Sequence, residues 1–181
     1  MISHRQLRNL ALIGFMGAGK SSVGRAVAEQ LGFEFVDTDE LIESRTGKSI
    51  TQIFASDGEA HFRELEHKIV EQLESSSERV ISTGGGLPTN QANMDSLKTH
   101  ALIVCLCVSP ERIWERVRHQ SHRPLLQTPD PQARIREMMA ARAPFYRQAD
   151  VLLNTDSRSM RQVIQQVVQN FQQATAKAKP R

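Results

Sequence analysis

Long apolar runs are absent from this chain of 181 residues, and the longest uninterrupted one covers only residues 101–108. A helix needs about 20 apolar residues to cross a bilayer, so this run is too short. The N-terminus also lacks the apolar segment of a secretory signal peptide. We therefore expect a cytoplasmic protein with no membrane partner.

Cysteine is scarce, and the two cysteines that occur stand two residues apart, at Cys105 and Cys107. In a strand this spacing directs both side chains to one face. The six histidines are scattered and form no zinc-ligand spacing with the cysteines. The sequence therefore favours neither a disulfide nor a structural zinc site.

Aromatic residues make up only 5% of the chain, and charge of neither sign dominates, because the net charge is +3. Basic residues nevertheless gather between residues 112 and 147, mostly as arginine, whose planar fork suits phosphate and carboxylate groups. A nucleic-acid surface is the alternative interpretation, but such surfaces interleave aromatic side chains that stack on bases. We expect no nucleic acid partner.

A glycine-rich segment at residues 14–21, Gly-Phe-Met-Gly-Ala-Gly-Lys-Ser, has the spacing of a phosphate-binding P-loop. It joins an apolar run at 9–13 to an amphipathic segment at 22–31, the order of strand, loop and helix. In such a loop Lys20 reaches the β- and γ-phosphates and Ser21 places its hydroxyl on Mg²⁺. The alternative, a glycine-rich turn that binds nothing, is disfavoured by the complete motif.

Short apolar runs alternate with segments of helical periodicity, which indicates a parallel sheet with helices on both faces. We expect one α/β domain over 1–181 with a core at about 7–170. Ligands of such sheets bind beyond the carboxyl ends of the strands. The five predicted strands are 9–13, 34–36, 79–82, 101–107 and 151–153.

Three segments depart from this alternation. A helical region broken by glycine-containing turns, at about 38–66, is predicted to be a small substrate-binding insertion. A polar, basic segment at about 118–130, between predicted helices at 110–117 and 132–142, is predicted to be a mobile lid. Residues 174–181 are small, polar and basic, and we expect them to form a disordered tail.

Two carboxylates follow the second predicted strand, at Asp37 and Asp39. If strand geometry persists, both project toward the nucleotide end of the sheet, where one would hold Mg²⁺ and the other would orient or deprotonate a substrate hydroxyl. The alternative is a helix start, because aspartate is a good N-terminal cap.

Other candidates lie farther along the chain. Glycines at 84–86 follow the third strand and expose bare backbone to a small ligand. Arg63 and Glu66 stand three apart on a predicted helix, where an ordinary surface ion pair is the alternative. Pro144 predicts a helix end at the preceding residue, so the alternative role of Arg142 is to cap that end.

Together these motifs resemble those of bacterial shikimate kinases of the small P-loop type, over about residues 7–170. The resemblance implies a three-layer P-loop kinase fold and ATP-dependent phosphorylation of the 3-hydroxyl of shikimate, in the pathway to chorismate and aromatic amino acids. It also implies one Mg²⁺ ion with ATP as co-substrate, and a monomer. The matching segments are 14–21, Asp37-Thr38-Asp39, Phe62-Arg63 with Glu66, 82–86, Arg123-Pro124-Leu125-Leu126 and Arg142-Ala143-Pro144-Phe145-Tyr146.

The same resemblance implies individual roles, although the segment between Arg118 and Arg123 is shorter here than in some family members. The implied catalytic residues are Asp39, Lys20 and Arg123. The implied ATP-binding residues are Gly17, Ala18, Gly19, Lys20, Ser21, Ser22, Arg118, Arg123 and Arg158. The implied shikimate-binding residues are Asp39, Arg63, Glu66, Gly84, Gly85, Gly86 and Arg142, with Phe54, Phe62, Pro124 and Leu125 as walls. The implied metal-binding residues are Ser21 and Asp37, the latter mainly through water.

Two other classes of function remain as alternatives. One is another small-molecule P-loop kinase, for gluconate or a nucleoside monophosphate, against which the implied arginine clamp for a carboxylate argues. The other is a nonenzymatic nucleotide-binding switch, but the Asn-Lys-x-Asp segment of guanine-specific switches is missing from the sequence.

Overall fold

A parallel sheet of five strands forms the centre of the computed structural model, which describes residues 5–119 and 128–178. Its strand order is β2-β3-β1-β4-β5, and every neighbouring pair is parallel, as predicted. The strands are β1 (Asn9–Ile13), β2 (Glu34–Asp37), β3 (Arg79–Ser82), β4 (Ala101–Cys107) and β5 (Val151–Asn154).

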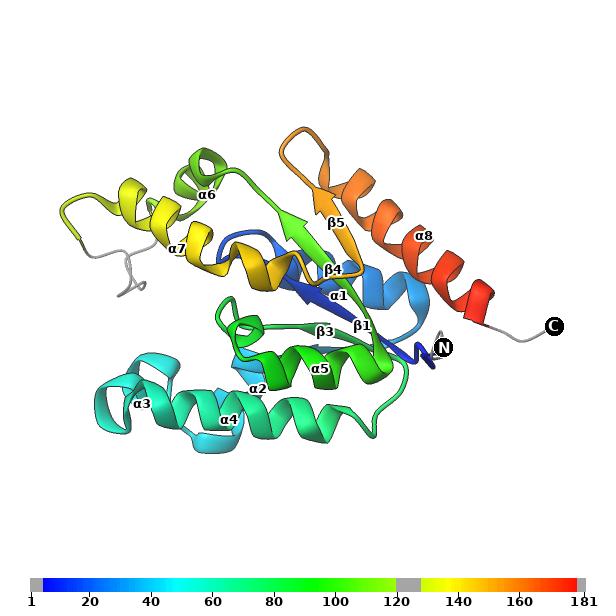
Figure 1. The fold of residues 1–181 in the computed structure, drawn as a ribbon, viewed down its shortest axis with the longest axis horizontal. Coiled ribbons are helices and arrows are strands. Elements are labelled where there is room, and N and C mark those ends of the chain that lie inside the picture. The colour runs from blue at the N-terminus through cyan, green and yellow to red at the C-terminus, as the bar shows by residue number, and fades with distance from the viewer. Residues whose placement is uncertain (1–4, 120–127, 179–181) are drawn as a thin grey trace.

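Helices cover both faces of this sheet, which confirms the predicted three layers (Figure 1). Helices α1 and α8 pack together on one face, and α4 and α5 pack together on the other. The helices are α1 (Lys20–Leu31), α2 (Thr38–Thr46), α3 (Ile50–Ser56), α4 (Gly58–Leu73), η1 (Leu87–Thr89), α5 (Gln91–His100), α6 (Pro110–Val117), α7 (Pro131–Tyr146) and α8 (Met160–Ala178).

The sheet has a hydrophobic core on each of its two faces, and β1, which contributes to both, is buried along its whole length. Leu10 and Leu12 point into the core beneath α1 and α8, whereas Ala11 and Ile13 point into the core beneath α4 and α5. This alternation of side chains along a strand buried on both faces explains why β1 reads as a continuous apolar run.

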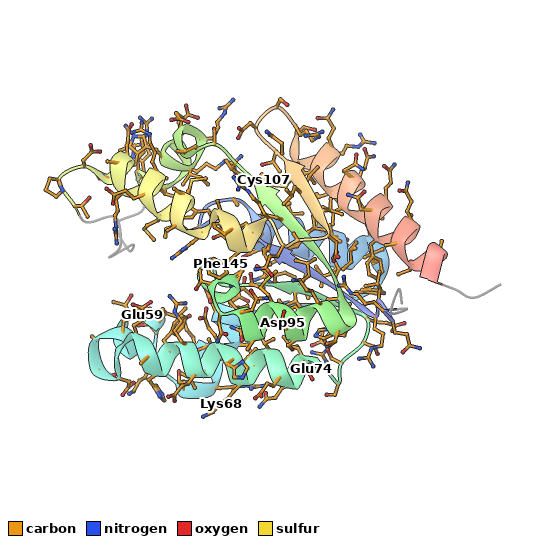
Figure 2. The ribbon with its side chains drawn as sticks, viewed as in Figure 1. Glu59, Lys68, Glu74, Asp95, Cys107 and Phe145 are labelled. Carbon is orange, nitrogen blue, oxygen red and sulfur yellow. The ribbon has the colours of Figure 1, made fainter. Side chains whose placement is uncertain are left out.

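The cysteines of β4 share one face, as predicted: their sulfur atoms lie 3.8 Å apart, and Cys107 is near the carboxyl end of the strand (Figure 2). Across residues 5–119 and 128–178, no three His, Cys, Asp or Glu side chains are grouped to hold a metal ion. Nor does any helix in these ranges have the length and apolar character needed to span a membrane.

Two predicted helix ends were wrong. Helix α7 continues through Pro144 to Tyr146 rather than ending near Arg142, and Pro144, which has no N–H, leaves one backbone hydrogen bond of the last turn unmade. Helix α8 reaches Ala178, so residues 174–178 are helical instead of forming a disordered tail. Alanine favours helix in this segment, and the Thr175 hydroxyl donates to the Phe171 carbonyl.

Two further predicted segments are the helical region at 38–66 and the lid at 118–130. The glycine-containing turns do divide the 38–66 region, into α2, α3 and the start of α4. The first break is stabilised by a capping box, in which Ser49 and Gln52 each bond the other's backbone N–H. Residues 120–127 of the predicted lid lie outside the described residues.

Candidate active site

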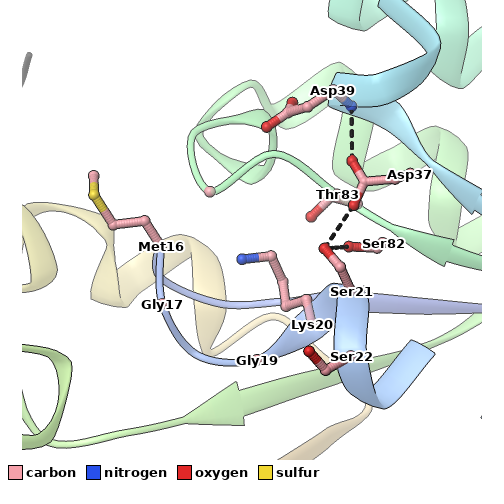
Figure 3. A pocket seen from close by; sticks show the side chains of 11 residues that line it. Met16, Gly17, Gly19, Lys20, Ser21, Ser22, Asp37, Asp39, Ser82 and Thr83 are labelled. Carbon is pink, nitrogen blue, oxygen red and sulfur yellow. Dashed lines mark hydrogen bonds between the residues drawn. The ribbon is translucent and has the colours of Figure 1, made fainter. Parts of the chain in front are cut away.

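The P-loop, β2 and the turn after β3 surround a pocket of about 230 Å³ at the carboxyl ends of the central strands (Figure 3). Its walls include Lys20 and Ser21 from the P-loop and α1, Asp37 and Asp39 from β2 and α2, and Gly85 from the glycine turn. Residues far apart in the sequence therefore meet where a parallel sheet usually binds its ligand.

The P-loop requires glycine at its first position. Gly14 has a φ of 138°, and a Cβ there would stand 2.7 Å from the carbonyl oxygen of Leu106 in β4. Any side chain would push the loop away from β4. The loop then passes directly into α1, whose N-terminus carries a partial positive charge that favours a phosphate.

Lys20 is buried, at 8% exposed, and its ammonium lies within the curve of the P-loop (Figure 3). Its Nζ donates to the carbonyl oxygens of Gly14 at 2.9 Å and Phe15 at 3.0 Å. These bonds hold a positive charge at the centre of the loop, close to the N-terminus of α1.

Ser21 and Asp37 form the oxygen-rich wall of the pocket. The Ser21 hydroxyl donates to Asp37 Oδ2 at 2.7 Å, and Ser82 Oγ lies 3.4 Å from Ser21 Oγ. Asp37 also caps α2, since its Oδ1 accepts from the N–H groups of Asp39 and Glu40. The cap confirms the interpretation of Asp37 as a helix start, and its carboxylate also lines the pocket beside the P-loop; its predicted role in holding Mg²⁺ stays a prediction.

Asp39 lies in the first turn of α2, so the predicted continuation of strand geometry was wrong. Its carboxylate still lines the same pocket as Asp37, because the helix starts at the end of β2. Burial raises the pKa of the Asp39 carboxyl to about 6, and the neighbouring Asp37 carboxylate adds to the rise. Its Oδ1 has no hydrogen-bond partner among the described residues.

Arg63 and Glu66, on α4, form an ion pair with an Nη1–Oε2 distance of 2.7 Å. The interpretation as a surface pair was wrong in one respect: the Glu66 side chain is only 1% exposed. Burial raises the pKa of Glu66 to about 7, although Arg63 opposes that rise. Oε1 of Glu66, like Oδ1 of Asp39, has no hydrogen-bond partner in the described part of the chain.

The glycine turn at 84–86 packs tightly against these charged groups. A Cβ on Gly84 would stand 2.5 Å from Asp39 Oδ1 and 2.9 Å from Glu66 Oε1, and one on Gly86 would stand 2.6 Å from Arg63 Nη1. The Gly84 N–H donates to the Thr38 hydroxyl at 2.9 Å, which ties the turn to α2. The absence of side chains thus lets backbone approach two carboxylates and a guanidinium.

Arg142 reaches the same turn from α7. Its Nη1 lies 3.4 Å from the position of a Cβ on Gly85, and its guanidinium carbon is 5.4 Å from the centre of the Phe15 ring in the P-loop. Arg142 stands one turn before the end of α7, so its guanidinium does not act as the helix cap considered from the sequence. Two arginines, from α4 and α7, therefore flank the glycine turn.

Several predicted residues lie elsewhere or are not described. Arg118 is exposed at the C-terminal end of α6, and the Arg158 guanidinium donates to the Asn154 carbonyl after β5. Phe54 and Phe62 pack with ring centres 4.9 Å apart, and Phe62 belongs to the core. Arg123, Pro124 and Leu125 lie outside the described residues.

Sequence reasoning missed the contributions of Thr38, Arg116 and Tyr146. Thr38 holds the Gly84 N–H, Arg116 donates to the P-loop carbonyls of Gly17 and Ala18, and the Tyr146 hydroxyl donates to the Gly85 carbonyl at 2.7 Å. Only Tyr146 carried a signal, as the single tyrosine of the chain, placed one helical turn after Arg142.

Comparison with known proteins gives a consistent set of relatives. Residues 16–172 match the family model described as "SKI: Shikimate kinase". The shikimate kinase of Thermodesulfovibrio yellowstonii is 40% identical over 166 residues, which cover 92% of this chain and 96% of the relative. That of a Synechococcus strain is 49% identical over 160 residues, which cover 87% and 84%.

Solved structures agree with these relatives. A shikimate kinase from Acinetobacter baumannii in complex with shikimate superposes with a TM-score of 0.87 at 37% identity, over 94% of this chain and 96% of that one. A gluconokinase from Sinorhizobium meliloti superposes with a TM-score of 0.59 at 18% identity, over 96% and 97%. The second likeness shows a shared fold alone.

Proposed function

The chain belongs to the shikimate kinase family, and on that premise we propose that it transfers the γ-phosphoryl group of ATP to the 3-hydroxyl of shikimate. The product is shikimate 3-phosphate, an intermediate on the way to chorismate and the aromatic amino acids. The matches over most of the chain give no support to a gluconate or nucleoside monophosphate kinase, or to a nonenzymatic switch.

One observation carries this proposal: a phosphate-binding loop and a carboxylate–arginine cluster face each other across the glycine turn. Lys20 and Asp39 line one pocket, while Arg63 and Arg142 each lie against a glycine of the turn. Phosphoryl transfer needs little covalent chemistry from the protein, so an enzyme must mainly place donor and acceptor in line and offset charge.

We assign the acceptor side as follows. The carboxylate of Asp39 orients the attacking hydroxyl and accepts its proton, since its Oδ1 has no partner among the described residues. Arg63 and Arg142 bind the shikimate carboxylate with their planar guanidinium groups. The Gly85 N–H donates to a ring hydroxyl, and Glu66 fixes the orientation of Arg63 through their 2.7 Å bond. Gly84 and Gly86 leave room for these contacts.

We assign the donor side to the P-loop. The N–H groups of Gly17, Ala18, Gly19 and the first residues of α1, including Ser22, would cradle the phosphates, as a helix N-terminus favours. Lys20 would offset charge on the transferring group. Arg123, which lies outside the described residues, would add a second positive charge, and Arg118 and Arg158 would approach the nucleotide base.

Mg²⁺ fits the donors present on the wall of the pocket. Ser21 Oγ and Asp37 Oδ2, 2.7 Å apart, are hard oxygen atoms of the kind that Mg²⁺ prefers, and Ser82 Oγ lies nearby. We propose that Ser21 and Asp37 hold the ion, with Asp37 acting mainly through water. When bound, the ion would neutralise charge on the phosphate oxygens.

The reaction can be tested by measuring ADP release with Mg·ATP in the presence and absence of shikimate. Quinate and gluconate serve as control acceptors. We expect strong stimulation by shikimate alone. Equal stimulation by gluconate would contradict the proposed acceptor, and ATP binding without any acceptor-dependent release would limit the site to nucleotide binding.

A further inference from the structure

The single tyrosine of the chain joins α7 to the glycine turn. Tyr146 is the last residue of α7, and its hydroxyl donates to the carbonyl oxygen of Gly85 at 2.7 Å, across 61 positions of sequence. Gly85 lines the pocket that also holds Lys20 and Asp39. The Tyr146 hydroxyl therefore donates a hydrogen bond to the backbone of the candidate site.

The peptide bond that receives this hydrogen bond lies between the two arginines of the site. The Gly85 carbonyl belongs to the peptide unit that links Gly85 to Gly86. Arg142 Nη1 stands 3.4 Å from the Cβ position of Gly85, and Arg63 Nη1 stands 2.6 Å from that of Gly86. The orientation of this one peptide thus affects how closely the guanidinium groups approach the turn.

A peptide between two glycines is easily reoriented, because neither residue has a Cβ that restricts φ and ψ. The flanking groups of the turn are held by nearer elements: Thr38 accepts from the Gly84 N–H, and the Thr89 hydroxyl donates to the Gly86 carbonyl at 2.7 Å. Among the described residues, the Gly85 carbonyl accepts a hydrogen bond from Tyr146 alone. Tyr146 therefore restrains the orientation of the Gly85–Gly86 peptide, which the bonds of Thr38 and Thr89 do not fix.

The phenol ring of Tyr146 is itself firmly placed. It packs against the hydrophobic cores on both faces of the sheet, at the point where α7 ends. Burial raises the pKa of its hydroxyl to about 12, so the group remains a neutral hydrogen-bond donor at physiological pH. Arg142 stands four residues earlier on the same face of α7, and its guanidinium interacts with the Tyr146 hydroxyl and opposes part of this rise in pKa.

We propose that Tyr146 is a positioning residue for the acceptor: its hydroxyl fixes the Gly85–Gly86 peptide between Arg63 and Arg142, and so sets the spacing of the clamp for the acceptor carboxylate. This inference rests on the proposed function, because that function supplies the carboxylate. Tyr146 acts through the glycine turn and needs no contact with the substrate.

Replacement of the hydroxyl tests the proposal. Tyr146→Phe keeps the ring that packs against both cores and removes the hydroxyl, which donates to Gly85 and also interacts with the Arg142 guanidinium. We expect the KM for shikimate to rise about three- to tenfold, the range for loss of hydrogen bonding by one hydroxyl. The KM for ATP and kcat should stay within about twofold, because the P-loop and Asp39 are untouched.

Thr99→Val is the matched control. The Thr99 hydroxyl also donates to a backbone carbonyl, that of Ser96, at 2.7 Å, but it lies near the end of α5 away from the pocket. Both variants should lose a similar, small amount of thermal stability, and only Tyr146→Phe should change the KM for shikimate. Equal changes in the KM for ATP and shikimate, or none in either, would overturn the proposal.

A spectroscopic measurement separates this inference from the proposed reaction. Tyr146 is the only tyrosine, so the tyrosine ring doublet in ultraviolet resonance Raman spectra reports its hydrogen bond alone. We expect a strong-donor signature in the wild type that persists when shikimate is added. A non-donor signature would refute the positioning role even if turnover is normal. Absent shikimate-dependent turnover in the wild type, with the donor signature intact, would instead refute the proposed function.

Discussion

Glu66 is held in the protein interior by Arg63, three residues earlier on α4, through an Nη1–Oε2 bond of 2.7 Å. The same guanidinium donates through Nη2 to Glu59, at 2.8 Å, but the Glu59 side chain is 64% exposed, near the start of α4 (Figure 2). Arg63 therefore joins one buried and one solvated carboxylate. The two pairs have similar lengths but differ in how much water screens them.

This difference predicts unequal effects of two matched substitutions. Glu66→Gln should raise the KM for shikimate about tenfold, because it removes the charge that orients Arg63 inside the protein. Glu59→Gln should change the same KM by less than about twofold, since exposed ion pairs contribute little. Steady-state kinetics with shikimate varied at saturating ATP measure the KM of both variants. Similar changes in KM for the two substitutions would show that the burial of Glu66 does not affect shikimate binding.

Much of this site was predictable from local sequence. The five strands are short apolar runs because both faces of the sheet bury them, and the P-loop is a contiguous motif whose geometry its own glycines determine. Asp37 and Asp39 were placed at the pocket because they stand at the end of β2, even though α2 begins at Thr38, before the assumed strand geometry reaches Asp39.

Contacts between distant elements were not predictable in this way. The i,i+3 spacing of Arg63 and Glu66 is the same for a surface pair and a buried one, and it is the glycine turn packed on Glu66 that decides between them. No local pattern tells where the Tyr146 hydroxyl points, because its partner Gly85 lies in another element. Packing between α7 and the turn sets that direction.

Asp39→Asn should separate chemistry from nucleotide binding. The amide keeps the size of the side chain but cannot accept the proton of the attacking hydroxyl, so we expect kcat to fall by a factor of about 100 to 10,000. The affinity for ATP, measured by titration calorimetry without shikimate, should stay within about threefold, because the P-loop is unchanged. Unaltered turnover of shikimate would remove Asp39 from the proposed role.

Arg142→Ala should chiefly weaken acceptor binding. Loss of charge-assisted hydrogen bonds costs about 1.5–3 kcal/mol, so the KM for shikimate should rise about ten- to hundredfold while the KM for ATP changes little. Arg147→Ala is the control, since Arg147 is an exposed arginine just beyond the end of the same helix. An equal rise in the control would mean that net charge, rather than the position of Arg142, governs binding.

His100 makes the folded state sensitive to acid. Its ring is fully buried at the end of α5, and Nδ1 lies 2.9 Å from the Asn9 amide nitrogen, so Nδ1 accepts and Nε2 carries the proton. Nε2 has no hydrogen-bond partner among the described residues. Burial lowers the pKa of His100 below its ordinary 6.5, and the positive charges of Arg8 and Arg5 oppose protonation while Glu74 favours it.

The direction of the resulting pH dependence follows from proton binding. Near and below pH 6.5 the unfolded chain protonates this histidine and the folded chain does not, so the free energy of unfolding should fall as the pH falls through that range. His100→Asn retains an acceptor for Asn9 but cannot be protonated. The variant should be less stable than the wild type at pH 8, and its free energy of unfolding should fall less than that of the wild type between about pH 7 and 5. Urea unfolding at each pH measures this, with the exposed His61→Asn as control. An identical slope in wild type and His100→Asn would contradict this account, because it would show that His100 binds its proton equally in the folded and the unfolded chain.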